Sequence, residues 1–211
     1  MSIFEMPVSF SLDKHPVVAS RFSGYNKRKI HTKNQEGAMK KDPFFHCYEE
    51  MKMCGRYYID SDMADEIQQV VREVDQRIRK AQFTGDIHPT ESAPVIEKSE
   101  NGLKLSMCKW GYPLSKRKSL VINARVESVM DKASFRNGIL YHRVLIPASG
   151  FYEWNWLKEK NTFTRPDARV LYMAGFCDWF ENERRFVILT TKANASMKKV
   201  HERMPLILEK E

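Results

Sequence analysis

Long apolar runs are missing from this 211-residue sequence. None approaches the ~18 residues of a membrane-spanning helix, and the N-terminus lacks the apolar stretch of a secretory signal peptide. Cysteine is scarce as well, and Cys47, Cys54, Cys108 and Cys177 include no pair with the C-x-x-C spacing of a zinc or redox motif. We therefore expect a soluble cytoplasmic protein without a disulfide, a structural metal or a cofactor.

The composition is otherwise that of a folded, basic protein. Hydrophobic residues make up 42% of the chain and aromatic residues 11%, which is too apolar for a wholly disordered chain. The length allows one domain, or one domain with an extension. The net charge of +8 favours a polyanionic partner, although a merely basic soluble protein is the alternative.

Residues 1–52 differ from the rest of the sequence. They contain the basic run Lys27-Arg28-Lys29 and show neither helical nor alternating periodicity, so we predict a disordered arm. Such an arm could bind nucleic acid. The alternative that we favour is an over-extended gene start, because Met53 is a plausible first residue and the codons of Glu49-Glu50 would resemble a ribosome-binding sequence. The folded domain is then 53–211.

The folded part reads as several strands and few helices. Residues 54–59 favour a strand, and Asp60 or Ser61 can cap a helix whose apolar stripe runs from Met63 to Ile78 at 3.6-residue spacing. Short helices are predicted over 129–138 and 194–200, a polar loop over 155–167, and an extended loop from Pro89 to Pro94. Further strands are predicted over 103–111, 120–122, 144–147, 150–154, 169–177 and 186–191. This pattern indicates an α+β domain with a mainly antiparallel, curved or barrel-like sheet and a few peripheral helices.

Cys54 is the first of the residues that could carry chemistry. It is followed by Gly55 and Arg56, and a nearby guanidinium favours the thiolate form of a cysteine. Free cysteines are mostly buried hydrophobic residues, however. The sequence therefore leaves open whether Cys54 is a nucleophile or a core residue.

The stretch Asn123-Ala-Arg125-Val-Glu127-Ser is a second candidate. In a strand, Asn123, Arg125 and Glu127 share one face, where an amide, a guanidinium and a carboxylate would be costly to bury without a ligand. The alternative is a surface ion pair between Arg125 and Glu127.

Glu153 and His201 are further candidates. Glu153 lies in the aromatic run Gly150-Phe-Tyr-Glu-Trp154, and a carboxyl group against aromatic walls tends to have a raised pKa and can act as a general acid or base. Alternatively, the rings are core and Glu153 faces water. His201 lies in His-Glu-Arg203-Met-Pro and could instead cap the preceding helix end as a cation.

In this order, Met53-Cys-Gly-Arg-Tyr, Asn-Ala-Arg-x-Glu-Ser, Gly-Phe-Tyr-Glu-Trp and Thr-Thr-x-Ala-Asn…His-x-Arg-Met-Pro resemble the signatures of the SOS-response-associated peptidase (SRAP) family, the abasic-site processing proteins. The resemblance runs from Cys54 to about Leu208 and implies the SRAP fold. It implies a protein that recognises abasic sites in single-stranded DNA and becomes covalently attached to them. We thus expect a cytoplasmic, nucleoid-associated monomer that protects lesions in the DNA damage response, with replication-associated proteins as further partners.

The resemblance also implies roles for the candidates. Cys54, freed as the N-terminal residue, would form a thiazolidine with the open-chain aldehyde of the lesion. Glu153 would shuttle protons during imine formation, His201 would assist sugar ring opening and crosslink reversal, and Asn123 would orient the cysteine or the sugar. The family name further implies autoproteolytic removal of preceding residues, and crosslink reversal implies a lyase-type reaction.

Five residues are implied as DNA contacts. Arg56 and Arg125 would hold phosphates that flank the lesion, and Trp110, Trp154 and Pro89 would pack against the splayed strand. Trp110 is, on residue type alone, more often a core residue.

Two features depart from the family. Its cysteine is the second translated residue, whereas residues 1–53 precede Cys54 here, and a Cys54 amine that remains in an amide cannot form a thiazolidine. The chain also stops soon after Pro205, so we expect a domain truncated at its C-terminus. Two other functions remain open: a cysteine peptidase or hydrolase that uses Cys54 and His201, and a non-catalytic single-strand-binding module with salt-sensitive affinity.

Overall fold

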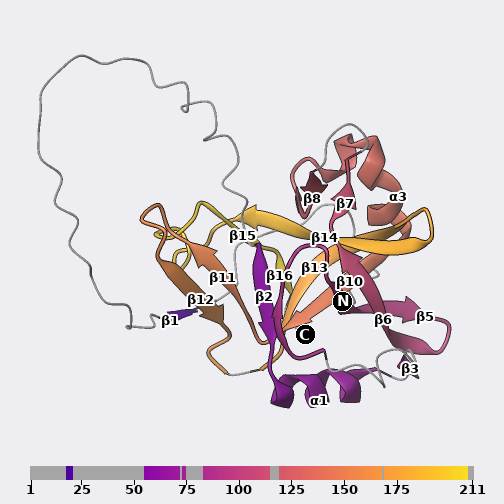
Figure 1. Cartoon of the computed structure of the whole chain (residues 1–211), viewed down its shortest axis with the longest axis horizontal. Helices are drawn as coiled ribbons and strands as arrows, with labels where there is room; N and C mark the ends of the chain where they lie inside the picture. The colour runs from indigo at the N-terminus through magenta and orange to yellow at the C-terminus, as the bar shows by residue number, and fades with distance from the viewer. Residues whose placement is uncertain are drawn as a thin grey trace, which may run out of the picture.

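The structure is a computed structural model of the whole chain. It describes the following residues: 18–20, 55–71, 73–74, 83–114, 119–167 and 169–208. Within these ranges the fold consists mainly of β-strands with few helices (Figure 1). The α+β class with a barrel-like sheet is thereby confirmed.

Five strands close into a barrel. They are β5 (Ser92–Ser99), β6 (Gly102–Trp110), β10 (Arg143–Ala148), β13 (Leu171–Phe180) and β14 (Glu183–Lys192). The order β14-β13-β10-β5-β6 is antiparallel throughout, and β6 then pairs in parallel with β14 to complete the ring. β13 and β14 approach each other closely at Gly175. A Cβ atom at this position would lie 2.6 Å from the carbonyl oxygen of Val187, so a larger residue would not fit there without a shift.

A network of polar side chains joins four of the barrel strands. Arg184 on β14 donates two hydrogen bonds to Glu97 on β5, at 2.9 and 2.8 Å, and one to the Sγ atom of Cys177 on β13 at 2.9 Å. Ser106 on β6 donates a hydrogen bond to Glu97. The free thiol of Cys108, also on β6, is hydrogen-bonded to the thiol of Cys177. Burial opposes ionisation of Glu97, but the hydrogen bonds from Arg184 and Ser106 hold its pKa below the usual value.

A second, five-stranded sheet lies beside the barrel. Its order is β1 (Val18–Ser20), β12 (Lys160–Thr164), β11 (Gly150–Trp154), β2 (Arg56–Ile59) and β4 (Gly85–Ile87), and all neighbours are antiparallel. β12 falls within 155–167, so the prediction of a loop throughout that range is wrong. Except for β1, the predicted arm over 1–52 lies outside the described residues.

The helix α1 (Ser61–Val70) begins where the sequence predicted and ends earlier. The Asp60 side chain accepts a hydrogen bond from the backbone N–H of Met63 at 2.9 Å, as an N-cap does. The backbone turns extended at Val71, and Glu73–Val74 form β3 in parallel with β6. The prediction that the helix continues past Val70 toward Ile78 is therefore wrong at Val71 and Glu73–Val74, and 75–82 lie outside the described residues.

The remaining elements cover the barrel. Two helical segments, η3 (Val129–Asp131) and α3 (Ala133–Tyr141), replace the single short helix predicted over 129–138. Phe135 of α3 contacts Phe176 of β13, with 5.4 Å between ring centroids. Residues 195–200 form turns, so the predicted helix there is wrong, and β5 already begins at Ser92, inside the predicted Pro89–Pro94 loop.

Short strands complete the sheets. They are β7 (Tyr112–Pro113), β8 (Leu120–Val121), β9 (Asn123–Arg125), β15 (Arg203–Pro205) and β16 (Ile207–Leu208). β9 runs parallel to β14, β15 runs antiparallel to it, and β16 pairs with β13. Among the described residues, no helix is long and apolar enough to cross a membrane.

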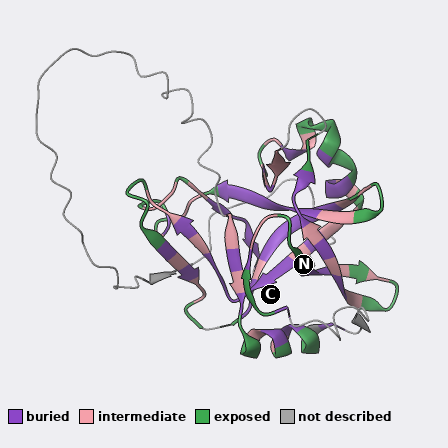
Figure 2. Ribbon diagram, viewed as in Figure 1, coloured by how far each residue is buried: buried purple, intermediate pink, exposed green. Residues whose placement is uncertain are grey.

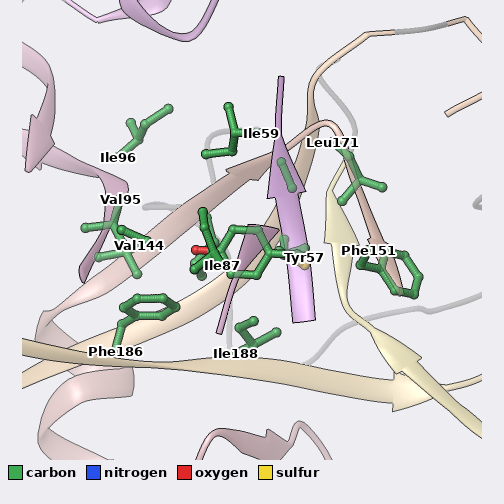
Figure 3. Packing of buried hydrophobic residues seen from close by; sticks show 14 of the residues in the cluster. Tyr57, Ile59, Ile87, Val95, Ile96, Val144, Phe151, Leu171, Phe186 and Ile188 are labelled. Atoms are coloured by element: carbon green, nitrogen blue, oxygen red, sulfur yellow. The ribbon is translucent and has the colours of Figure 1, made fainter. Parts of the chain in front are cut away.

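The main core cluster is shared by the barrel and the second sheet (Figure 3). Tyr57 of β2 lies among Val144, Phe186 and Ile188 of the barrel strands, and Phe151 of β11 belongs to the same cluster. Burial of such side chains stabilises the fold by roughly 1.5–3 kcal/mol each. The two sheets are therefore held together by one continuous apolar core.

Candidate functional site

The first and third sequence motifs lie on neighbouring strands. β2 and β11 pair so that Arg56 is opposite Tyr152, Tyr57 opposite Phe151, and Tyr58 opposite Gly150. The glycine in the third motif is required there, because a Cβ at position 150 would lie 2.8 Å from the Tyr58 ring and 2.7 Å from a backbone oxygen of β12. The pairing places the chain that enters β2 beside the end of β11.

Cys54 itself lies outside the described residues. The residue bonded to it, Gly55, is described and partly buried, and a Cβ built on Gly55 would meet nothing within 4 Å. A side chain at position 55 would therefore not clash with its neighbours, so packing does not explain why a glycine follows Cys54. Whether Cys54 is a nucleophile stays a prediction.

Glu153 is buried, with 4% of its surface exposed. Its Oε1 atom accepts a hydrogen bond from the backbone N–H of Trp154 at 3.3 Å, and in the sheet it pairs with Asn161 of β12. The alternative that Glu153 simply faces water is wrong. Because successive residues of a strand point to opposite faces, Glu153 shares the inner face of β11 with the core residue Phe151, while Tyr152 and Trp154 face the other way.

The second motif divides at the end of β9. Asn123 is partly buried, Ala124 is buried and Arg125 is exposed. The chain then turns, so Glu127 does not continue the strand face that the alternation predicted. Glu127 pairs with Arg203, and the predicted alternative of an Arg125–Glu127 ion pair is wrong.

His201 is held by the backbone that follows it. Its Nδ1 atom accepts a hydrogen bond from the backbone N–H of Arg203 at 3.0 Å. A neutral imidazole with an accepting Nδ1 carries its proton on Nε2. The Nε2 atom is therefore the one that can exchange protons. Because residues 195–200 form turns, the alternative that His201 caps a helix is wrong.

Arg203 ties the second and fourth motifs together. Its guanidinium donates to both carboxylate oxygens of Glu127, at 2.7 and 2.8 Å, and to the backbone oxygen of Thr190 at 2.8 Å. The hydrogen bonds from Arg203 lower the pKa of Glu127. β9 and β15 both pair with β14 at Thr190. Arg203 thus joins their ends across this central strand.

The five predicted DNA contacts fall into two groups. Arg56, Pro89, Arg125 and Trp154 are at least partly exposed, and the Arg56 guanidinium lies 5.5 Å from the centre of the Trp154 ring. Trp110 is fully buried, and its position corrects the expectation that it packs on DNA.

Trp110 connects the first two motifs from inside. Its ring centroid lies 5.3 Å from that of Tyr57 and 6.0 Å from that of Phe186. Its indole N–H donates to the backbone oxygen of Ile122, next to Asn123, at 3.0 Å. The flat indole and its single donor therefore fix the spacing between β2 and the start of β9.

Sequence reasoning missed two residues around Arg56 and Trp154, namely Lys160 and Asp86. Lys160 lies with its Nζ atom 3.5 Å from the centre of the Tyr152 ring, and Asp86 accepts from the Tyr152 hydroxyl at 3.1 Å. Burial and the Asp86 carboxylate raise the pKa of Tyr152 to about 12. The run Thr162-Phe163-Thr164 consists of residue types that favour strands, and this signal could have located β12 and with it Lys160. No group of His, Cys, Asp and Glu in the described part of the chain could hold a metal ion.

The four motifs share one foundation, since the main core cluster contains Tyr57, Ile122, Phe151 and Met204, one from or beside each motif. The chain thus belongs to a class of proteins in which a five-stranded barrel and a flanking antiparallel sheet hold these four motifs on one core. Residues 53–211 match the family model SOS response associated peptidase (SRAP). The chain belongs to this family.

Several named proteins are similar to this chain. It is 30% identical to the abasic site processing protein YoqW of Bacillus subtilis (strain 168) over 175 residues, which cover 75% of this chain and 77% of that protein. It is 29% identical to the abasic site processing protein YoaM of the same strain over 172 residues, 74% of this chain and 75% of that one.

Solved structures show the same fold. A protein from Bordetella bronchiseptica matches with a TM-score of 0.62 at 23% identity, covering 74% of this chain and 84% of that one. A protein from Bacteroides thetaiotaomicron also matches with a TM-score of 0.62, at 21% identity, covering 74% and 77%.

Proposed function

We propose that this protein recognises abasic sites in single-stranded DNA and crosslinks to them through Cys54 as an N-terminal residue. Its relatives are named abasic site processing proteins. The observation that carries the proposal is the anchoring of all four motifs on one core cluster, with the buried Glu153 beside the strand that follows Cys54. Such a rigid base suits a reaction that needs its groups held in place.

The chemistry requires both groups of an N-terminal cysteine. The α-amine, with a pKa near ~7.7, attacks the C1′ aldehyde of the opened sugar, and loss of one water gives a Schiff base. The Cys54 thiol then adds to the C=N carbon, and its proton passes to the nitrogen, which closes a five-membered thiazolidine. No atom leaves in the second step, so the adduct weighs the sum of the partners less one water.

The described side chains fit roles in these steps. A protonated Glu153 can donate to the departing hydroxyl of the carbinolamine and take the proton back. His201, with Nδ1 occupied by the backbone, can exchange a proton at Nε2 with the sugar ring oxygen or the C1′ hydroxyl. Asn123 would orient the sugar or the cysteine by hydrogen bonding. Reversal of these steps is the lyase-type reaction.

Four exposed or partly exposed residues would bind the strand. Arg56 and Arg125 would contact phosphates, while Trp154 and Pro89 would pack against sugars and bases. Trp110 would act from the core by positioning Tyr57 and Ile122. We expect the protein to act as a cytoplasmic monomer that associates with nucleoid DNA and protects the lesion, with replication-associated proteins as partners.

The test is intact-mass spectrometry after incubation with single-stranded DNA that carries one abasic site, for chains 1–211 and 54–211. The expected result is an adduct less one water with 54–211, and with 1–211 only if residues 1–53 have been removed, for example by autoproteolysis. A matched control is Cys54→Ser in 54–211, which keeps the amine and should give an adduct only after borohydride reduction of the imine.

Other outcomes would point elsewhere. An adduct on 1–211 with all residues retained contradicts thiazolidine formation. Turnover of a peptide substrate without any adduct would favour the peptidase alternative. Salt-sensitive DNA binding that Cys54→Ala leaves unchanged, again without an adduct, would favour a non-catalytic binding module.

A further inference from the structure

The outer face of β2, β11 and β12 carries alternating cations and aromatic rings. Tyr152 is directly opposite Arg56, and Trp154 is directly opposite Lys160. Each cation crosses diagonally to a ring, with Lys160 3.5 Å from the Tyr152 centroid and Arg56 5.5 Å from the Trp154 centroid. Because two neighbouring strands hold each side chain at a fixed register, this face presents its charges in a fixed pattern.

The tip of the β11–β12 hairpin extends this face with apolar side chains. Trp156 is 77% exposed and Leu157 is 55% exposed, and the hairpin tip is coloured as exposed in Figure 2. An exposed tryptophan beside an exposed leucine gains nothing from burial in this chain. Both side chains are therefore accessible to another molecule.

The tip is ordered from within. Asn155 accepts hydrogen bonds from the backbone N–H groups of Leu157 and Glu159, at 3.0 and 2.9 Å, and its amide donates to the Glu159 carboxylate at 2.8 Å. Lys158 adopts a positive φ of 60° to complete the turn. The backbone that carries Trp156 is therefore set before any ligand binds, which lowers the entropy cost of binding.

We propose that this hairpin is a second contact surface for the DNA strand, in which Trp156 stacks on a base beyond the lesion and Lys160 neutralises an intervening phosphate. This inference rests on the proposed function, and it adds two residues to the four strand contacts named above. Trp156 lies two residues after Trp154, in the turn that follows β11. Trp156 therefore meets a base beyond the nucleotide that Trp154 contacts.

Charge favours nucleic acid as the occupant. Arg56 is partly neutralised by Asp86, 3.5 Å away, whereas Lys160 lies over the Tyr152 ring and is exposed. An aromatic side chain next to an exposed cation is the arrangement by which proteins bind single strands without sequence preference. The net charge of +8 acts in the same direction.

The experiment measures the affinity of the full chain for oligonucleotides of 3 and 15 nucleotides. Each carries a central tetrahydrofuran abasic analogue, which has no C1′ hydroxyl and cannot open to an aldehyde. We expect Trp156→Ala to weaken binding of the longer strand about tenfold and of the shorter one less than about twofold, the effect of losing one stacked base. Lys160→Gln should reduce the salt dependence of the longer complex by about 0.7 in slope, one phosphate contact.

Two matched variants control for general effects. Trp156→Phe keeps a stacking ring and should retain most of the affinity. Trp179→Ala removes another exposed tryptophan, 60% exposed, at the end of β13 on the far side of the molecule (Figure 1), and should change nothing.

Equal affinity of the wild-type chain and Trp156→Ala for the longer strand would overturn this inference, and would leave the tip to a protein partner. The covalent proposal is read separately in the adduct experiment. An adduct together with an unaffected Trp156→Ala means that only the hairpin contact is wrong. A tenfold loss without any adduct means that the hairpin binds DNA but the crosslink does not form.

Discussion

The barrel and the five-stranded sheet differ in the partners and the exposure of their charged residues. In the barrel, Arg184 is held by Glu97 and Cys177, and the arginine and glutamate side chains are only 21% and 17% exposed. On the sheet, Lys160 and Arg56 lie over rings at the surface, and the carboxylate partner of Arg56, Asp86 at 3.5 Å, is partly exposed. This barrel pair is satisfied internally, while these two cations of the sheet stay accessible.

This difference separates a structural from a binding role. A buried guanidinium that loses its carboxylate is costly to the fold, whereas a surface cation contributes little to stability and remains available to an external anion. Substitutions in the barrel should thus change stability, and substitutions on the sheet should change binding. The following predictions test this division.

The largest effect is expected for Trp110→Ala. The side chain is fully buried, contacts Tyr57 and Phe186, and donates to the backbone of Ile122. We expect a loss of about 3–5 kcal/mol in the free energy of unfolding, measured by urea denaturation. Trp110→Phe, which keeps a ring and loses the hydrogen bond, should lose less. A stable Trp110→Ala variant with weakened DNA binding would contradict the core role assigned here.

Glu97→Ala should have the next largest effect. It leaves the guanidinium of Arg184 without its two carboxylate bonds in a mostly buried place. We expect a loss of about 2–3 kcal/mol in the free energy of unfolding, below the range for fully buried pairs because both side chains are partly exposed. The double variant Glu97→Ala with Arg184→Met should recover part of this loss. If the double variant loses as much free energy of unfolding as Glu97→Ala and Arg184→Met lose when added together, the two residues are not energetically coupled.

Acid should destabilise the barrel through the same residue. The pKa of Glu97 is lowered in the folded state, so its stabilising contribution is present above the unfolded value of about 4.3. It is lost as the pH falls through the lowered folded pKa. We expect the stability of the wild-type protein between about pH 5 and pH 3 to fall more steeply than that of Glu97→Gln, in thermal unfolding across that range. If stability falls equally with pH in both proteins, the ionisation of Glu97 is not coupled to unfolding.

The smallest effect on stability is expected for Glu127→Gln. Its carboxylate is bonded to Arg203 at 2.7 and 2.8 Å, but the side chain is 40% exposed. Solvent screening limits the cost to less than about 1 kcal/mol. Denaturant unfolding of Glu127→Gln beside Glu97→Gln measures the contrast directly. A larger loss for Glu127→Gln than for Glu97→Gln would contradict the expectation that the more buried ion pair contributes more to stability.

Much of the fold could be predicted from local pattern. Alternation located β6, and short runs of apolar and aromatic residues located β2, β10, β11, β13 and β14, each to within a few residues. Local pattern failed where tertiary pairing overrides it. The apolar stripe from Met63 to Ile78 continues at helical spacing, but the chain leaves the helix at Val71 to place Glu73–Val74 beside β6.

The site could be predicted as a set of residues but not as contacts. Sequence placed Asn123, Glu153 and His201 in distinct motifs, yet it could not show that Arg203 reaches Glu127, 76 positions away. Trp110 is the instructive error, because tryptophan suits both a core and a stacking surface. Only the three-dimensional neighbours, Tyr57 and Phe186, decide between the two.

The closing of the barrel by β14 has a consequence for synthesis. The contacts that complete the ring join residues 74 and 87 positions apart, Lys109 with Glu183 and Glu97 with Arg184. A chain that leaves the ribosome from its N-terminus exposes β5, β6, β10 and β13 before β14 exists to join β13 to β6. Until residue 192 has emerged, an open sheet with two free edges awaits its last strand, and such edges pair readily with other chains. Slow translation of this final stretch would prolong that exposure and favour aggregation over folding.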